Sequence, residues 1–286
     1  MRSSWKVGTA FGIGIYVHWT FFALPALAFG QGYMQGGYGH AWFQLGLVLC
    51  VCACIILHEL GHALMARVFG ITTRDITLYP IGGVARLERM SARASHEILI
   101  AVAGPLVNVV LGCILAMAGI GLVGLLGQAA TPTQFVLLLA LANIGLVLFN
   151  MIPAFPMDGG RVFRALLSLV VDYVQATEIA YYVGVGLAVL FGAISVLAMS
   201  QGGVMMAGLG IIAVFLIFAG KYELNAVRYR AALRQAEPID AVPADAPEPM
   251  TPAEAGFSGY TWDADLHAYI LWRNGRQVAA YPVPTE

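Results

Sequence analysis

The feature that most constrains this chain is a series of long apolar runs. Six of them are long enough to cross about 30 Å of hydrocarbon as helices, which takes roughly 20 residues each. They lie at residues 13–30, 41–69, 97–127, 133–150, 179–199 and 204–220. The 286 residues are 59% hydrophobic and only 11% charged, well below the charge content of an average soluble domain. We therefore expect an all-α polytopic membrane protein with about six transmembrane helices.

Lysine and arginine are confined to one side of these predicted spans. Three of the loops between them contain neither residue type, namely residues 31–40, 128–132 and 200–203. Because basic residues accumulate in cytoplasmic loops, both termini are predicted to be cytoplasmic. A cleaved secretory signal is the weaker alternative for the first run, which contains His18 and Trp19 and is long for the apolar part of a signal peptide.

Charge and cysteine content exclude little further. A net charge of −1 gives no indication of a nucleic-acid partner, and none is predicted. The four cysteines are all in apolar runs and form no disulfide framework: Cys50, Cys52, Cys54 and Cys113. The partner that the composition does indicate is the lipid bilayer.

Composition and patterning divide the chain into four predicted parts. A transmembrane domain over residues 1–220 is followed by a charged, amphipathic stretch at 221–236, which predicts a helix on the membrane surface. Residues 237–256 are rich in proline, alanine and acid and predict an extended linker. Residues 257–286 alternate around Asn274-Gly275, which predicts a small β-hairpin module. A second hairpin is predicted for "TTRDITLYPIGGVARLE", residues 72–88, which alternates around a Gly-Gly bend.

The second apolar run contains "HELGH" at residues 58–62. Two histidines at i and i+4 lie on one face of a helix, so His58 and His62 can bind one Zn²⁺. Glu59, next to the first histidine, is placed to accept a proton from a zinc-bound water. Three polar groups at membrane depth are costly unless they are paired, solvated or bound to metal. The motif therefore predicts a metal site within the membrane.

A catalytic zinc takes three protein ligands and keeps one open position, so a third ligand is needed. The polar side chains that are candidates at this depth are His18, Asn108, Asn143, Asn150 and Asp158. Asp158 is the best of them because it is anionic and belongs to "NMIPAFPMDGGR", whose prolines end a helix. Unwound backbone at membrane depth must line a cavity or be buried in protein.

These two motifs, in this order, resemble those of the site-2 protease family of intramembrane zinc metalloproteases. The second motif has the family form N-x-x-P-x-x-P-x-D-G, with Met157 where leucine is usual. "YPIGGVARL" (residues 79–87) and "AGPLVN" (residues 103–108) are also similar to family segments. The resemblance covers about residues 12–220. The remaining residues match neither the PDZ nor the CBS domains that some family members carry.

The resemblance implies roles for individual residues. It implies one Zn²⁺ per chain, bound by His58, His62 and Asp158, with Glu59 as general base and acid. Asn150 would bind the substrate backbone or the developing oxyanion, its alternative being a polar residue at the end of a broken helix. The resemblance also implies a membrane-associated sheet at the predicted hairpin, in which the strand that contains Gly82 and Gly83 would hold an unwound substrate segment extended.

For four other residues, site support and plain packing both stay open: His18, Cys54, Asn108 and Asn143. The implied substrates are transmembrane proteins or peptides, and the implied location is a prokaryotic inner membrane. Arg67 and Arg161 follow the two motifs closely, which predicts a site nearer the cytoplasmic face. A cation transporter using the same ligands and a non-catalytic scaffold that binds client helices are the alternatives. Transporters tend to show repeats and several intramembrane carboxylates, whereas these spans offer essentially Glu59 and Asp158.

Overall fold

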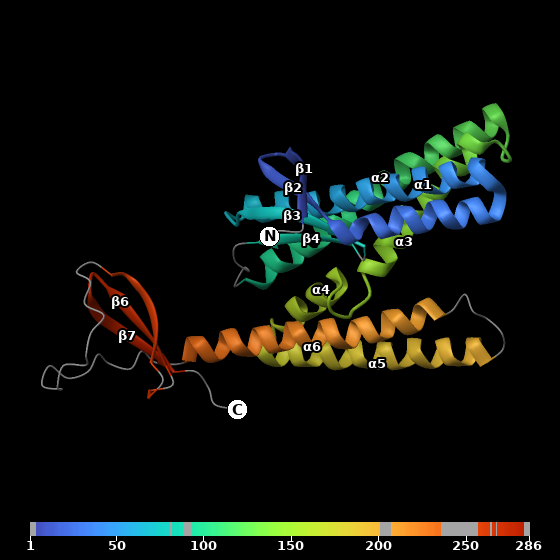
Figure 1. Cartoon of the computed structure of the whole chain (residues 1–286). Helices are drawn as coiled ribbons and strands as arrows, with labels where there is room; N and C mark the ends of the chain where they lie inside the picture. The colour runs from blue at the N-terminus through green and yellow to red at the C-terminus, as the bar shows by residue number, and fades with distance from the viewer. Residues whose placement is uncertain are drawn as a thin grey trace, which may run out of the picture. The chain divides into compact units, whose positions relative to one another are not determined.

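The chain was studied as a computed structural model. It describes residues 4–80, 82–87, 93–200, 207–235, 257–263, 265–266 and 268–282. The chain divides into two compact units, Met1–Glu223 and Leu224–Glu286. Both are drawn in Figure 1.

A four-stranded sheet in the first unit is built from two hairpins that lie far apart in the sequence. Strands β1 (Ser4–Ala10) and β2 (Ile13–His18) pair antiparallel, as do β3 (Thr73–Tyr79) and β4 (Gly82–Leu87). β2 and β3 join the hairpins in parallel, which gives the order β1-β2-β3-β4. The β3–β4 pair confirms the predicted hairpin, and β4 is an edge strand.

The prediction of a membrane helix starting at residue 13 is wrong in its first turns, because these residues form β2. Ile13 and Val17 are buried, at 2% and 8% exposure. Short apolar runs of this kind suit a strand or a helix equally by pattern. Two neighbouring strands provide hydrogen-bond partners here, and the chain becomes helical only at the 3-10 turn Trp19–Phe22.

The helix α1 (Ala23–Val68) folds back on itself at Gly36 and Gly37 (Figure 1). Gly37 has a φ of +70°, which favours glycine. The two arms touch at Gly32, where an added Cβ would lie 2.7 Å from the carbonyl oxygen of His40. The arms of α1 therefore correspond to the first two predicted runs, and the longer arm carries the HELGH residues.

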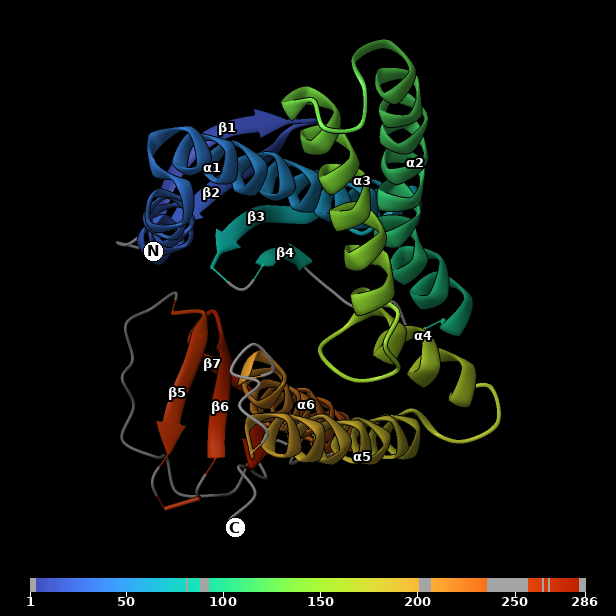
Figure 2. The same ribbon diagram turned by 90° about the vertical axis from the view of Figure 1, so that its right-hand side faces the viewer.

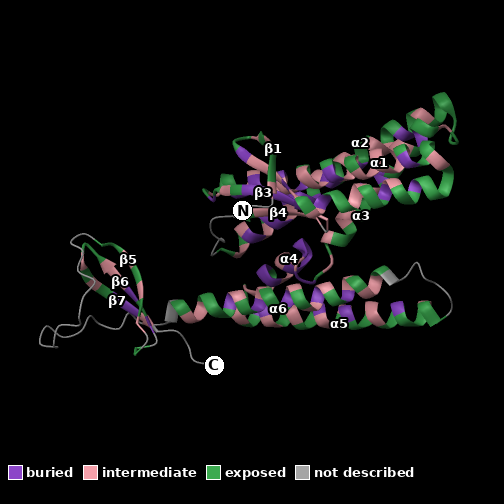
Figure 3. Ribbon diagram, viewed as in Figure 1, coloured by how far each residue is buried: buried purple, intermediate pink, exposed green. Residues whose placement is uncertain are grey.

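Among the described residues, five helices are long and apolar enough to cross a membrane. They are α1, α2 (Ala94–Leu126), α3 (Thr131–Asn150), α5 (Tyr173–Ser200) and α6 (Ala207–Gln235). Many of their residues are exposed, as Figure 3 shows, and large apolar side chains such as Ile120 and Leu125 are among them. Small residues such as Ala101 and Ala140 are buried instead, which is typical of helix contacts in membranes. The chain is a multi-pass membrane protein.

An irregular segment separates α3 from the short helix α4 (Asp158–Leu167). α3 ends at Asn150, as the prolines of the second motif predict. Ala154 and Met157 of this segment are buried in a core with Ala188 of α5 and Leu216 of α6. α4 contacts α2 on one side and α5 on the other (Figure 2). The helix α4, whose first residue is Asp158, is thereby held between α2 and α5.

The second unit holds the last turns of α6 and a three-stranded antiparallel sheet, β5 (Gly259–Asp263), β6 (Ala268–Arg273) and β7 (Arg276–Pro282). β6 and β7 join at Asn274 and Gly275, both with positive φ, as the Asn-Gly pair predicts. α6 runs without a break through the predicted start of a surface helix at residue 221. The predicted linker at 237–256 lies outside the described residues. The surface location of 221–235 stays a prediction.

Candidate metal centre

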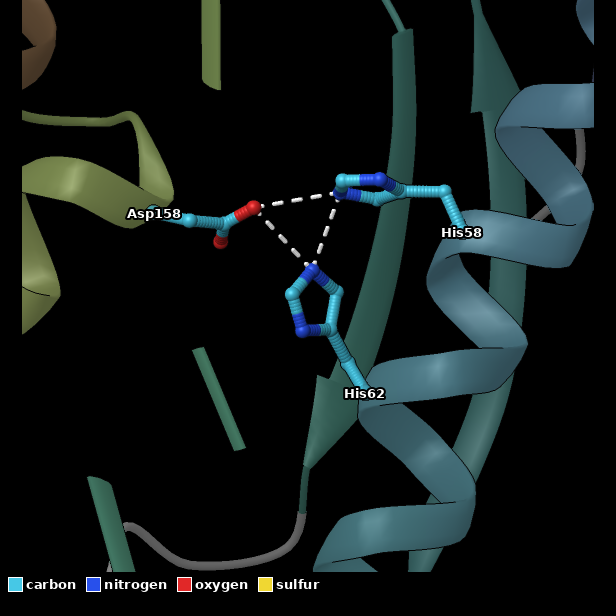
Figure 4. A group of neighbouring side chains, drawn as sticks. All are labelled: His58, His62 and Asp158. Atoms are coloured by element: carbon cyan, nitrogen blue, oxygen red, sulfur yellow. Dashed lines mark hydrogen bonds and ion pairs between the residues drawn. The ribbon is translucent and has the colours of Figure 1, made fainter. Parts of the chain in front are cut away.

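Three side chains from α1 and α4 meet at one buried point (Figure 4). His58 and His62 project from successive turns of α1, and Asp158 faces them from the start of α4. Asp158 Oδ2 lies 3.1 Å from His58 Nε2 and 3.2 Å from His62 Nε2. The two Nε2 atoms are 3.0 Å apart. All three residues are at least 94% buried.

The spacing of these atoms fits a small metal ion. A tetrahedral zinc with bonds of about 2.0–2.1 Å holds its ligand atoms about 3.3–3.4 Å apart. His62 Nδ1 lies 2.7 Å from the carbonyl oxygen of Ile100, which can only accept, so Nδ1 carries the proton. A neutral His62 then turns the lone pair of Nε2 towards the carboxylate of Asp158. Electron-rich atoms that face each other in a buried site need a cation between them.

Gly104 of α2 forms a wall of this site. An added Cβ there would lie 2.3 Å from His62 Nε2 and 2.8 Å from His58 Nε2. No side chain can occupy that position without displacing the histidines. The glycine of "AGPLVN" thus lets the backbone of α2 approach the ligand atoms.

Asp158 offers a carboxylate oxygen to this site. Burial opposes the charge of its carboxyl, whereas the nearby Arg161 favours that charge. The first turn of α4, where Asp158 lies, is also where a helix favours negative charge, so Asp158 could bind a metal ion as an anion.

A buried ion-pair cluster holds α4 in place. Arg164 is fully buried and donates to Glu97 of α2 and, at 2.8 Å, to Glu223 of α6. Its guanidinium also lies 4.9 Å from the ring centroids of Phe155 and Tyr173. Burial opposes its charge, but Glu97, Tyr173 and Glu223 raise the pKa of Arg164 above its ordinary value. One turn and a half after Asp158, this cluster ties α4 to α2 and α6.

Glu59 lies beside β4. Its side chain is partly buried, and an added Cβ on Gly83 would lie 2.7 Å from Glu59 Cγ. Gly83 therefore allows the edge strand to pass directly over the Glu59 side chain. Gly82 has a φ of +141°, a conformation that favours glycine. Of the two predicted substrate-binding glycines, Gly83 is the one in contact with Glu59.

The other predicted polar residues are placed as follows. Asn150 donates from Nδ2 to the carbonyl oxygen of Leu146, one turn back in α3; its role towards substrate stays a prediction. His18, at the end of β2 and not in a helix as expected, caps the 3-10 turn by accepting from the Thr20 amide. Asn108 is fully buried and contacts His58.

Sequence reasoning missed three residues that shape the site: Gly104, Ile100 and Arg164. The signal for Gly104 was present, since "AGPLVN" was singled out as a motif, although its contact with the histidines was not anticipated. A backbone carbonyl such as that of Ile100 leaves no trace in a sequence. Arg164 pairs with residues 59 and 67 positions away, which no local pattern indicates.

The geometry can be compared with known proteins. Residues 46–131 and 120–191 match the sequence profile of peptidase family M50, which covers about half of the chain. A zinc metalloprotease of Methanocaldococcus jannaschii is 36% identical over 199 residues, covering 68% of this chain and 56% of the relative. Stage IV sporulation protein FB of Bacillus subtilis is 26% identical over 164 residues, covering 57% of this chain and 50% of the relative. The chain thus spans about half the length of these relatives.

A solved structure is also similar. The site-2 protease from Methanocaldococcus jannaschii superposes with a TM-score of 0.57 at 31% sequence identity. The match covers 77% of this chain and 95% of that chain. The likeness therefore extends over nearly the whole of the solved protein.

Proposed function

Since this chain belongs to peptidase family M50, the site-2 protease family, we propose that it is an intramembrane zinc endopeptidase that cleaves transmembrane segments of membrane proteins. His58, His62 and Asp158 would hold one zinc ion per chain. The substrate would be a transmembrane protein or peptide. The lipid bilayer is the other partner, and no nucleic acid is involved.

The observation that carries this proposal is the buried cluster of His58 Nε2, His62 Nε2 and Asp158 Oδ2 (Figure 4). The three atoms face one another at spacings close to those around zinc. Two nitrogens and a carboxylate oxygen form the donor set of many catalytic zinc sites, which keep the fourth position open. Fe²⁺ and Co²⁺ suit the same ligands, so metal analysis is part of the test below.

Zinc in such a site polarises the scissile carbonyl and lowers the pKa of its bound water. Glu59, adjacent to His58 and partly buried, accepts a proton from the attacking water and returns it to the leaving amine. Asn150, eight positions before Asp158, binds the substrate backbone or the developing oxyanion. In the structure Nδ2 donates one of its two hydrogens to the carbonyl oxygen of Leu146, and the other hydrogen is the one that would bind substrate.

The edge strand β4 suits the binding of an unwound substrate. A helix hides its peptide bonds in its own hydrogen bonds, so a transmembrane substrate must become extended before cleavage. An exposed strand edge can bind an extended segment through backbone hydrogen bonds. β4 is the last strand of its sheet and passes over Glu59 at Gly83. A substrate strand added to this edge would lie beside the catalytic carboxylate.

Charge distribution supports a site near the cytoplasmic face of the membrane, with both termini in the cytoplasm. The membrane would be a prokaryotic inner membrane, as the family resemblance implies. Arg67 follows His62 at the end of α1, and Arg161 follows Asp158 within α4. Basic residues near span ends favour the cytoplasmic side. Cleavage at this depth would release a product into the cytosol.

A cleavage assay with Glu59→Gln tests the function. Purified protein in detergent is incubated with a model transmembrane substrate, and the products are identified by mass spectrometry. The wild type and Glu178→Gln, a matched change in α5, are expected to cleave, whereas Glu59→Gln is expected to lose activity by at least about 100-fold. A transporter or a scaffold would not cleave at all. Cleavage that persists in Glu59→Gln would contradict the mechanism.

Metal analysis of the wild type and Asp158→Ala tests the ligand set separately. One zinc per chain is expected in the wild type and a large loss in the variant, because two histidines alone bind zinc weakly. Unchanged zinc content in Asp158→Ala would refute the third ligand while leaving the assay with Glu59→Gln to decide on catalysis.

A further inference from the structure

Two buried amides next to the metal centre have no part in the mechanism above. Asn108 of α2 and Asn143 of α3 are both fully buried in a membrane helix bundle. We propose that they form a hydrogen-bond relay that holds His58 in the one neutral tautomer that can bind the metal. The inference rests on the proposed metal site, and it assigns both asparagines as positioning residues.

The relay is a continuous chain of contacts across three helices. His58 Nδ1 lies 2.8 Å from Asn108 Oδ1. Asn108 Nδ2 donates to Asn143 Oδ1 at 3.0 Å. Asn143 Nδ2 donates to the carbonyl oxygen of Leu139 at 2.9 Å and to Cys54 Sγ at 3.4 Å. The chain starts at a backbone carbonyl of α3 and ends on a metal ligand of α1.

The starting carbonyl sets the direction of every link. The Leu139 oxygen can only accept, so Asn143 must turn its NH₂ group towards it and its Oδ1 towards α2. Asn108 must then present its own NH₂ group to that oxygen, which leaves its Oδ1 facing His58. An oxygen at 2.8 Å requires a proton on His58 Nδ1. In neutral His58 the lone pair is then on Nε2, the atom that faces His62 and Asp158.

Reversing the relay has a clear penalty. If Asn108 were flipped, its Oδ1 would face Asn143 Oδ1, and its NH₂ group would require an acceptor at His58 Nδ1. The proton of neutral His58 would then lie on Nε2 and point at the other ligands. If Asn143 were flipped as well, its Oδ1 would face the Leu139 oxygen. The fully buried position offers no water to relieve either contact.

The two metal-binding histidines therefore reach the same protonation pattern by different routes. His62 Nδ1 donates directly to the carbonyl oxygen of Ile100. The protonation pattern of His58 depends on the carbonyl oxygen of Leu139, which acts through the side-chain amides of Asn143 and Asn108. Outer hydrogen bonds of this kind orient metal-bound histidines, and their loss typically weakens metal affinity 10- to 100-fold. The dependence makes His58 the ligand that is sensitive to residues of α2 and α3.

Zinc affinity, measured by chelator competition on the purified protein, tests the relay. Asn108→Leu removes the acceptor and is expected to weaken zinc binding about 10- to 100-fold. Asn108→Asp keeps an oxygen on His58 Nδ1 but places its other oxygen against Asn143 Oδ1, and it is expected to bind zinc more tightly than Asn108→Leu. If Asn108 serves only packing, this order reverses, because a buried carboxylate costs more than an apolar side chain of similar size.

Thr133→Val is the matched control. Thr133 is also a fully buried polar residue of α3, and its hydroxyl has no hydrogen-bond partner within the part of the chain that the structure describes. Zinc affinity in this variant is expected to equal that of the wild type. The absorption spectrum of the Co²⁺-loaded protein provides a second readout, since a change of ligand orientation at His58 alters the visible bands in Asn108→Leu and not in Thr133→Val.

The double variant tests whether Asn143 acts through Asn108. Asn143→Leu is expected to weaken zinc binding, and Asn108→Leu combined with Asn143→Leu is expected to be no weaker than Asn108→Leu alone. If Asn108→Leu does not fold, Asn143→Leu is compared with Asn143→Asp, which keeps the acceptor towards Asn108. Full zinc affinity in both leucine variants would overturn the relay. A wild type that binds no zinc would instead overturn the proposed function.

Discussion

The HELGH segment of α1 and the segment from Asn150 to Arg161 bring ligands to the same point, but they are supported by different forces. His58 and His62 are part of a regular helix, and their outer contacts are neutral hydrogen bonds to an amide and a carbonyl. Asp158 follows an irregular segment, and α4 is anchored by the charges of Arg164, Glu97 and Glu223.

The difference follows from what each segment needs. Helical periodicity already sets the spacing of two histidines at i and i+4, so their supports need only choose the ring orientation and the tautomer. A single ligand that follows an irregular segment has no helical spacing to fix its position. Its position must come from contacts with other elements, and ion pairs in a buried site provide strong ones when each charge is paired. We expect the Asp158 side to be the more fragile of the two.

Arg164→Met gives the largest expected effect, because it breaks the ionic support. Two carboxylates, Glu97 and Glu223, would lose the Arg164 guanidinium that pairs with both of them. That guanidinium is fully buried. Breaking a buried pair in this way costs about 3–5 kcal/mol. Thermal unfolding in detergent is expected to show the loss, together with reduced zinc content.

A triple variant provides the control for this change. Arg164→Met combined with Glu97→Gln and Glu223→Gln removes the unpaired charges and is expected to recover part of the stability. Arg230→Met, at an exposed arginine of α6, is expected to have little effect. Wild-type stability and zinc content in Arg164→Met would show that α4 does not depend on the ion pairs.

Gly104→Ala attacks the neutral side and is the next largest. The new Cβ would overlap His62 Nε2 and His58 Nε2, so the histidines must move away from Asp158. Overpacking of this kind costs about 1–3 kcal/mol, and most of the bound zinc is expected to be lost. Gly121→Ala in the same helix meets nothing within 4 Å and is expected to be neutral or to stabilise by about 0.5–1 kcal/mol. Equal zinc content in both variants would exclude Gly104 as a wall of the site.

The same contrast decides what could be predicted from the sequence. His58 and His62 follow from helix periodicity, and the helical spans follow from apolar length. The end of α3 and the turn at Asn274-Gly275 follow from proline and glycine chemistry. Each of these signals is contained within one continuous stretch of the sequence. Predicting Asp158 as a ligand required the second motif as well, because Asp158 lies 100 positions after its contact His58 on α1.

The features that were missed depend on distant partners. β2 was assigned to a helix because its own apolar run fits a helix as well as a strand, and its pairing with β3 joins residues that lie far apart in the sequence. For Asn108 and Asn143 the sequence leaves packing and site support equally open, since these amides meet His58 only when the helices pack together. The contacts of Arg164 and Gly104 are of the same kind. The sequence gives the type of side chain at each position, whereas it does not show which distant residue that side chain contacts.

Gly83→Ala tests the contact between the sheet and Glu59, the proposed general base. An added Cβ would lie 2.7 Å from Glu59 Cγ and displace the side chain, without contacting the metal ligands. Cleavage is expected to fall about 10- to 100-fold through misplacement of Glu59, while zinc content stays at the wild-type level. Gly8→Ala in β1, with nothing within 4 Å, is the control. A parallel loss of zinc would mean that Gly83 acts on the metal site and not on Glu59.

His18→Asn is expected to have the smallest effect and sharpens the comparison by testing a histidine whose hydrogen bonds are local. His18 accepts from the Thr20 amide, lies 2.7 Å from Thr20 Oγ1 and stacks on Tyr79. Asparagine is a good cap, so His18→Asn should keep the stability of the 3-10 turn, whereas His18→Ala should lose about 1 kcal/mol. Both variants are expected to keep full zinc content and cleavage, because the cap acts on the start of α1 and not on its HELGH turns. Loss of zinc in His18→Asn would instead place this histidine among the groups that support the metal.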